Sequence, residues 1–373
     1  MTYDVQNLPF KTLLPRVAVA EDQLARLDEI VRRSPVGEGF AERGHFLDAA
    51  ANMWISGELL HIEDLVFHDA HMDIRSPTHE LVIGHGILRA RRRVASAKPG
   101  WAESEAGIAA LTGAERITSS IASGVAAERG GEGADEPPDE DDDPLSRELA
   151  RIDAVLERSR RVLDGVGTQA PTVRAERSSL VVGELVIRDA EWDEQERLSQ
   201  WQSVRRHAAD LPPVLSAALL FDAWETIQPL RRQHWLGGQL VAASLRARGK
   251  VVSHLPALAV GLKAVPRERR RSFDRIKRLL AFLDAMCLAA QSGMKEIARL
   301  DQARQLMERK LRGRRSTSSL PAAIELILSR PIVSTAMVAK AANVTPRGAL
   351  NLIAELGVRE MTGRGSYRAW GIL

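Results

Sequence analysis

The chain has 373 residues, of which 45% are hydrophobic and 27% charged, a composition typical of a globular protein with a sizeable core. Its single cysteine, Cys287, excludes a disulfide framework and a cysteine-rich zinc site. Aromatic residues make up only 4%, and no apolar run approaches the roughly 18 residues of a membrane span, so we expect a mainly α-helical, soluble, cytoplasmic protein with no membrane partner.

Opposite charges are concentrated in different parts of the chain. Residues 128–143 hold nine acids and one arginine, whereas residues 310–373 hold ten basic and three acidic residues. The acidic stretch is rich in glycine and proline and cannot bury apolar surface, so we expect a disordered linker over 128–144. The basic C-terminal part suggests an anionic partner, although a solvated helical surface would have the same charge balance.

The first 100 residues have the pattern of successive helices. Apolar residues spaced by three or four predict one buried helical face, made of Val17, Ala20, Leu24, Leu27 and Val31. Further helices are predicted over 46–54, 59–67 and 77–95.

Five of the nine histidines fall in one short stretch: His61, His68, His71, His79 and His85. His68 and His71 are three apart and could share a helical face with nearby acids. Their spacing matches no zinc motif, however, so we expect no metal and no other cofactor.

A helical body is predicted after the linker. It starts with a helix near 145–163 and a β-leaning stretch over 179–187. Helices follow over 193–208, 212–226, 236–248, 267–290 and 295–311. Cys287 lies in an apolar stretch and is expected to be buried and unreactive. The basic run 267–271 indicates a solvated helix start, with a contact to the DNA backbone as the alternative.

The last 55 residues carry the clearest local signals. Pro321 opens a first helix, and Ser334 can cap a second one. Thr345 and Pro346 start a third helix, which Gly357 closes. Three short helices with a tight turn between the last two predict a helix-turn-helix.

Two β-leaning stretches, 358–362 and 366–372, flank the glycine-rich turn at 363–365 and predict a wing with a basic tip. The third helix is expected to bury Ala349, Leu350, Ile353 and Leu356. Its polar residues would then face the major groove, where arginine suits guanine and asparagine suits adenine. Basic wing tips and residues at helix starts, to which we assign Thr335 and Lys340, would contact phosphates. The predicted DNA-binding residues are Thr335, Lys340, Thr345, Arg347, Asn351, Arg364 and Arg368.

The expected partner is therefore double-stranded DNA. A single winged helix binds DNA modestly, so we expect a homodimer on a two-fold site. Winged helices also serve as protein–protein modules, and that alternative stays open.

The run PIVSTAMVAKAANVTPRGALNLIAELGVRE resembles the winged helix-turn-helix at the C-terminus of many bacterial Fic-domain proteins. The stretch LPPVLSAALLFDAWETIQPLRRQHWLGGQL is similar to the core of Fic domains. That resemblance implies a Fic-like helical core in which a loop after the matched helix would carry nucleotidyl transfer.

The chemical positions of that loop differ from the Fic pattern. Gln228 stands where the resemblance implies a general-base histidine, and a glutamine amide cannot take up a proton near neutral pH. Arg232 stands at the metal-binding acid, and His234 lies within the former phosphate-binding stretch. Pro229 and Gly238 match the pattern. We therefore expect a degenerate loop, with no catalytic residue, at Gln228, Pro229, Arg232, His234 and Gly238.

The N-terminal region resembles the inhibitory segment of Fic proteins at residues 52–57, where Ser56 replaces the inhibitory glutamate. At closer range, GHFLDAAANMWISGELLHIEDLVFHDAHMDIRSPTHEL and GRGSYRAWGIL resemble a family of unknown function, often plasmid-encoded, in rhizobia and other α-proteobacteria. That family pairs a body of unknown function with a C-terminal helix-turn-helix.

We thus expect four parts: an N-terminal helical domain (1–127), the linker (128–144), a Fic-like helical core (145–312) and a winged helix-turn-helix (313–373). The predicted function is sequence-specific transcriptional regulation, with a catalytically inactive body that supports dimerisation or senses a ligand whose nature is unknown. The alternatives are a Fic-related nucleotidyltransferase with an altered loop and an antitoxin-like interaction module.

Overall fold

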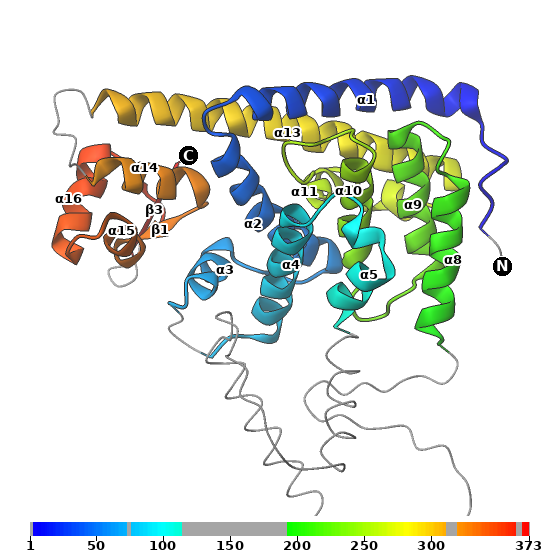
Figure 1. Cartoon of the computed structure of the whole chain (residues 1–373), viewed down its shortest axis with the longest axis horizontal. Helices are drawn as coiled ribbons and strands as arrows, with labels where there is room; N and C mark the ends of the chain where they lie inside the picture. The colour runs from blue at the N-terminus through cyan, green and yellow to red at the C-terminus, as the bar shows by residue number, and fades with distance from the viewer. Residues whose placement is uncertain (1–2, 73–75, 114–191, 311–318, 363–367, 373) are drawn as a thin grey trace, which may run out of the picture. The chain divides into compact units, whose positions relative to one another are not determined.

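The computed structural model describes residues 3–72, 76–113, 192–310, 319–362 and 368–372, and these are mainly helical (Figure 1). The expected linker, the helix near 145–163, the stretch 179–187 and Arg364 lie outside the described residues. Residues 3–113 and 194–372 belong to one compact unit. The four-part division of the chain stays a prediction.

Two long helices, α1 (Phe10–Arg33) and α13 (Arg275–Arg309), pack along each other (Figure 1). The predicted apolar face of α1 is confirmed, because all five of its residues are buried and Leu13 extends it. Burying such a face contributes about 1.5–3 kcal/mol for each large side chain. The α1–α13 pair therefore forms one wall of the core.

The prediction of two helices over 267–290 and 295–311 is wrong. A short α12 (Arg267–Arg270) precedes Asp274, whose carboxylate accepts the backbone N–H of Ile276 at 2.9 Å and caps α13. From there α13 continues without a break through Gly293. A Cβ at Gly293 would lie 2.7 Å from the side chain of Leu27, so this glycine permits close packing of α1 instead of ending a helix.

The remaining helices of the N-terminal part are α2 (Gly37–Ser56), α3 (Ile62–Asp69), α4 (His79–Ser96), the 3₁₀ helix η1 (Trp101–Glu103) and α5 (Glu105–Thr112). Among them, α2 contacts both α1 and α13, and α3 and α4 pack on α2. Thr78 and Ser104 accept backbone N–H groups at the starts of α4 and α5. The start of α4 was predicted at Pro77, two residues early.

From residue 192 onward the body continues with α8 (Glu194–His207), α9 (Pro213–Ile227), α10 (Leu236–Ala247) and α11 (Leu258–Ala264). The first three were predicted within two residues, whereas α11 was not predicted. Among the described residues, no helix combines the length and the apolar character needed to cross a membrane.

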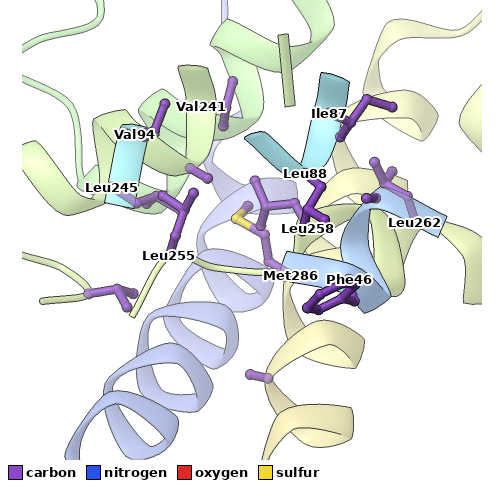
Figure 2. Packing of buried hydrophobic residues seen from close by; sticks show 14 of the residues in the cluster. Phe46, Ile87, Leu88, Val94, Val241, Leu245, Leu255, Leu258, Leu262 and Met286 are labelled. Atoms are coloured by element: carbon purple, nitrogen blue, oxygen red, sulfur yellow. The ribbon is translucent and has the colours of Figure 1, made fainter. Parts of the chain in front are cut away.

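One hydrophobic core joins the helices before residue 114 to those after residue 191 (Figure 2). Phe46 on α2 and Leu88 on α4 lie in the same cluster as Leu245 on α10, Leu258 on α11 and Met286 on α13. Residues before 114 and after 191 therefore build a common interior.

A buried polar network crosses this interior. Arg91, of which 1% is exposed, donates to Asp48 at 2.6 Å, to the Gln239 amide oxygen at 2.8 Å and to the Leu255 carbonyl at 3.1 Å. Asp48 also accepts the backbone N–H of Ala259 at 2.7 Å. Since buried charges require such partners, the network fixes how α2, α4, α10 and α11 fit together.

The C-terminal part contains three helices and a small antiparallel sheet of order β1-β3-β2. The helices are α14 (Leu320–Ser329), α15 (Thr335–Ala342) and α16 (Pro346–Leu356), and the strands are β1 (Val333–Ser334), β2 (Arg359–Glu360) and β3 (Ala369–Gly371). The three predicted helices and the hairpin are confirmed. Strand β1, which was not predicted, pairs Val333 with Trp370 and completes a winged helix.

Candidate nucleic-acid interface

Local capping signals set the geometry of the helix-turn-helix. Asn343 ends α15 with φ at 51°, in the left-handed region that asparagine tolerates. The Thr345 hydroxyl accepts the N–H of Gly348 at 3.2 Å, and Pro346 takes the first position of α16. Gly357 closes the helix at φ 65°. These residues hold α15 and α16 at a tight turn.

The outer face of α16 is polar and exposed near its start. Thr345, Arg347 and Asn351 are exposed, and no described residue forms an ion pair with Arg347. The predicted burial of Leu350 is wrong, because 40% of it is exposed. Ala349, Ile353 and Leu356 already fill the buried face, and at 100° per residue Leu350 points away with Arg347 and Asn351.

Of the two residues predicted at helix starts, Thr335 lies at one and Lys340 does not. Lys340 is in the last turn of α15 and not at a helix start, so it is exposed beside the turn to α16. Thr335 is the first residue of α15 and is half-buried, while Ser334 caps that helix by accepting the N–H of Met337 at 3.2 Å.

Within the wing, Arg368 is exposed but engaged in the hairpin. Its guanidinium donates to Glu360 at 2.6 Å and lies 5.2 Å from the centre of the Trp370 ring. The neighbouring Arg359 on β2 is exposed and has no ion-pair partner among the described residues. Sequence reasoning did not single out Arg359, although its place in a predicted wing strand was a usable signal.

The winged helix is held against the body through α2. Arg43, only 3% exposed, donates to the carbonyls of Ile327 and Arg330 and to the Glu296 carboxylate at 2.9 Å. Arg330 in turn donates to Glu42 at 2.6 Å. These bonds satisfy the carbonyls at the end of α14 with a side chain of the body.

A second connection runs from α13 to the end of β3. Arg299 donates to the Ile372 carbonyl at 2.6 Å and to Glu296 at 2.6 Å. Glu296 therefore lies between Arg43 and Arg299 and stabilises both cations.

The loop after α9 contains the positions predicted to be degenerate. Gln228 ends α9 at φ 49° and is exposed, Pro229 is buried, and Arg232 is exposed. His234 contacts Glu225 at 2.8 Å, and this hydrogen bond raises the pKa of His234 above its usual value. Since both residues are exposed, the side chains of Gln228 and Arg232 face solvent.

Gly237 and Gly238 meet different surroundings at the start of α10. A Cβ at Gly237 would lie 2.3 Å from the Trp224 ring, whereas one at Gly238 would meet no atom within 4 Å. The glycine required for packing is therefore Gly237, which follows the loop and lies against α9. On α2, the Ser56 hydroxyl is exposed and donates to the Asn52 carbonyl at 3.1 Å.

The predicted shared face of His68 and His71 is wrong. The helix α3 ends at Asp69, and His71 lies beyond it with φ at 55°. The His68 ring instead contacts that of His85 edge-on at 4.6 Å between centroids, and His85 approaches Asp69 at 3.5 Å. Cys287 is buried in α13, as predicted, and burial raises the pKa of its thiol.

Comparison with known proteins supports the class of the C-terminal part. Residues 320–373 match the family described as "HTH DNA binding domain", and residues 186–312 match "Protein of unknown function (DUF1612)". The predicted fold class, a mainly helical body with a C-terminal winged helix-turn-helix, is confirmed. The chain is thus a helical protein with a DNA-binding domain of the helix-turn-helix class.

The full chain is 44% identical over 384 residues to "Uncharacterized protein y4cF" of Sinorhizobium fredii (strain NBRC 101917 / NGR234), and the alignment covers 100% of both proteins. The chain belongs to the family of this rhizobial protein, as expected. Among solved structures, it is similar to a Fic family protein from Desulfovibrio desulfuricans G20 with a TM-score of 0.47 and 12% identity, covering 100% of this chain and 98% of that one.

Proposed function

We propose that the protein is a sequence-specific transcriptional regulator that binds double-stranded DNA through α16. The observation that carries this proposal is the exposed start of α16, where Arg347 and Asn351 lie one turn apart on one face. These two side chains match the donor and acceptor patterns of guanine and adenine in the major groove. Leu350, exposed between them, suits contact with a thymine methyl group.

Backbone contacts would position that helix. Lys340 beside the turn and Arg359 on the wing are exposed and basic, and Thr335, Arg364 and Arg368 belong to the same proposal. Their phosphate contacts would set register without reading sequence. A two-fold DNA site would require a homodimer, which we propose the helical body provides.

We also propose that the body does not transfer nucleotidyl groups. Gln228 cannot act as a general base, and the positive charge of Arg232 disfavours a bound metal ion at that position. His234 in the same loop contacts the Glu225 carboxylate at 2.8 Å. The role we propose for the body instead is dimerisation or ligand sensing.

Selection of genomic DNA fragments by the purified full chain tests the regulator proposal. The wild type should enrich a discrete motif, whereas Arg347→Ala/Asn351→Ala should lose or relax it. Losing one bidentate base contact costs about 1–3 kcal/mol, or roughly 5- to 150-fold in affinity. The charge-matched control is Arg89→Ala, which removes an exposed arginine on α4, more than 250 residues before α16 in the sequence. This variant should enrich the same motif as the wild type.

Two other outcomes would contradict the proposal. Binding that is sensitive to salt, blind to sequence and unchanged in the double variant would exclude α16 as the recognition helix. No DNA binding under any condition would instead favour the alternative of a protein-interaction module.

A further inference from the structure

The short helix α12 and the start of α13 carry an excess of positive charge. Residues 267–278 hold seven basic and two acidic residues. Three of the basic side chains, Arg267, Arg271 and Lys277, are exposed, and none of them forms an ion pair with a described residue. Because no acid of the described body neutralises them, these three cations are available to an anionic partner.

Other arginines of the same run are fixed to the body. Arg269 donates to Asp284 of α13 at 2.6 Å, and Arg278 donates to Asp222 of α9 at 2.6 Å. Both acids are largely buried. These ion pairs attach the segment firmly to two helices, so the three available cations project from a well-supported backbone.

The loop after α9 adds a fourth available cation. Arg270 lines a small recess together with Glu225, whose carboxylate contacts His234 of that loop at 2.8 Å. The hydrogen bond to Glu225 raises the pKa of His234, and the nearby positive charge of Arg271 opposes that rise. Arg232 in the same loop is exposed and has no ion-pair partner within the described part of the chain. The loop and the 267–278 segment therefore meet at Glu225.

A phenylalanine lies between these cations in the sequence. Phe273, in the connection from α12 to α13, is fully exposed, more so than any other large apolar side chain among the described residues. Arg278 donates to its carbonyl at 3.1 Å, and Asp274 after it caps α13. Burying such a side chain contributes about 1.5–3 kcal/mol, which the isolated chain forgoes. A partner that is both anionic and partly apolar would match the cations and Phe273 together.

DNA has both properties, because its phosphates are anionic whereas its sugars and base faces are apolar. The chain already contains a domain that matches a DNA-binding family. On α13, Lys277 lies 22 residues before Arg299, which bonds the Ile372 carbonyl of the winged helix. That separation is about 33 Å. One turn of B-DNA is about 34–36 Å, so a duplex along α13 presents its backbone near both positions.

We propose that Arg232, Arg267, Arg271 and Lys277, the basic patch, form with Phe273 a second DNA-contacting surface, which binds the backbone of duplex DNA without reading its sequence. The cations bind phosphates, and Phe273 packs against the sugars. The winged helix and the patch then hold one duplex at two places, and the second contact is intramolecular. The path of the DNA along α13 rests on the proposed function, whereas phosphate binding by the patch does not.

Fluorescence anisotropy of the full chain with a mixed-sequence duplex of about 40 base pairs tests this surface. The triple variant Arg267→Gln/Arg271→Gln/Lys277→Gln removes three phosphate contacts, each of which contributes about 0.9 to the slope of log affinity against log salt. Between about 50 and 200 mM salt, the wild type should therefore lose roughly 40-fold more affinity than this variant. Equal losses would overturn the proposal.

A matched control removes the same charge elsewhere. Arg89→Gln/Lys98→Gln/Arg206→Gln replaces two arginines and one lysine that are exposed and form no ion pair with a described residue. This control should keep the salt dependence of the wild type, and a reduction as large as that of the triple variant would overturn the proposal. Arg267→Lys/Arg271→Lys keeps both charges and should also keep the wild-type slope.

Phe273→Ser tests the apolar contact. It should weaken DNA binding by about 3- to 10-fold at every salt concentration, the value of burying half of a phenylalanine side chain, and leave the slope unchanged. Unchanged affinity would exclude Phe273 from the surface. Vesicles of phosphatidylcholine with about 30% phosphatidylserine test the other anionic partner. Vesicle binding that the triple variant loses, with no change in its DNA binding, would overturn the proposal in favour of a membrane surface.

The variant Arg347→Ala/Asn351→Ala separates this surface from the proposed function. In that background the triple substitution should still lower the salt slope, because the patch acts without α16. If it does so while the wild type enriches no motif, the proposed function fails and the surface stands. A motif enriched by the wild type, with a salt slope that the triple substitution leaves unchanged, would overturn the surface alone.

Discussion

Removing the guanidinium of Arg91 should destabilise the body strongly. In Arg91→Met the Asp48 carboxylate, whose side chain is 2% exposed, loses its cation and stays buried. Breaking a buried ion pair by removing one partner costs about 3–5 kcal/mol, because the remaining charge is uncompensated. The carbonyl of Leu255 and the amide oxygen of Gln239 also lose a donor. Since a domain of this kind is stable by only about 5–15 kcal/mol, this loss is a large share.

Urea unfolding followed by the fluorescence of the buried tryptophans Trp201 and Trp224 measures this loss. Arg89→Met, an exposed arginine on the same helix, is the control and should change the free energy of unfolding by less than about 0.5 kcal/mol. The double variant Asp48→Asn/Arg91→Met should be more stable than Arg91→Met alone, because no unpaired charge remains. A loss below about 1 kcal/mol in Arg91→Met, or a double variant less stable than the single, would refute the reasoning.

Two further predictions follow from packing and burial. Gly237→Ala should lower the free energy of unfolding by about 1–3 kcal/mol, because its Cβ would overlap the Trp224 ring. Gly238→Ala should raise the free energy of unfolding by about 0.5–1 kcal/mol, because its Cβ would meet no atom within 4 Å and alanine favours a helix over glycine. Equal effects of the two variants in urea unfolding would contradict this packing. Burial lowers the pKa of His254 to about 4, so the unfolded chain takes up a proton below pH 6.5 that the folded chain does not. Stability should therefore fall by up to about 3 kcal/mol from pH 6.5 to 4, and His254→Phe, but not His61→Phe, should flatten that slope in pH-dependent urea unfolding.

The C-terminal elements could be predicted because their signals are local. Ser334, Thr345, Pro346 and Gly357 each act on the backbone within a few residues, so their types alone locate helix ends. The error at Leu350 has a local cause as well. The buried face of α16 is made by Ala349, Ile353 and Leu356, and Leu350 is rotated by 100° from Ala349, outside that face.

Features that depend on distant contacts could not be read from the sequence. Gly293 favours a helix break locally, and only its contact with Leu27 explains why α13 continues. The partners Asp48 and Gln239 are 191 residues apart, and Arg43 lies 284 residues before its acceptor Ile327. No periodicity or spacing marks such groups in advance.

The continuity of α13 has a mechanical consequence. Arg278 donates to Asp222 at 2.6 Å near one end, and Arg299 donates to Ile372 at 2.6 Å, 21 residues and about 32 Å further along. A rigid rod of that length, tilted by only about 2°, moves its far point by about 1 Å. That displacement is enough to break the bond to Ile372. If α13 moves as a rigid body, a tilt at the Arg278–Asp222 contact therefore displaces the Arg299–Ile372 contact at the end of the winged helix.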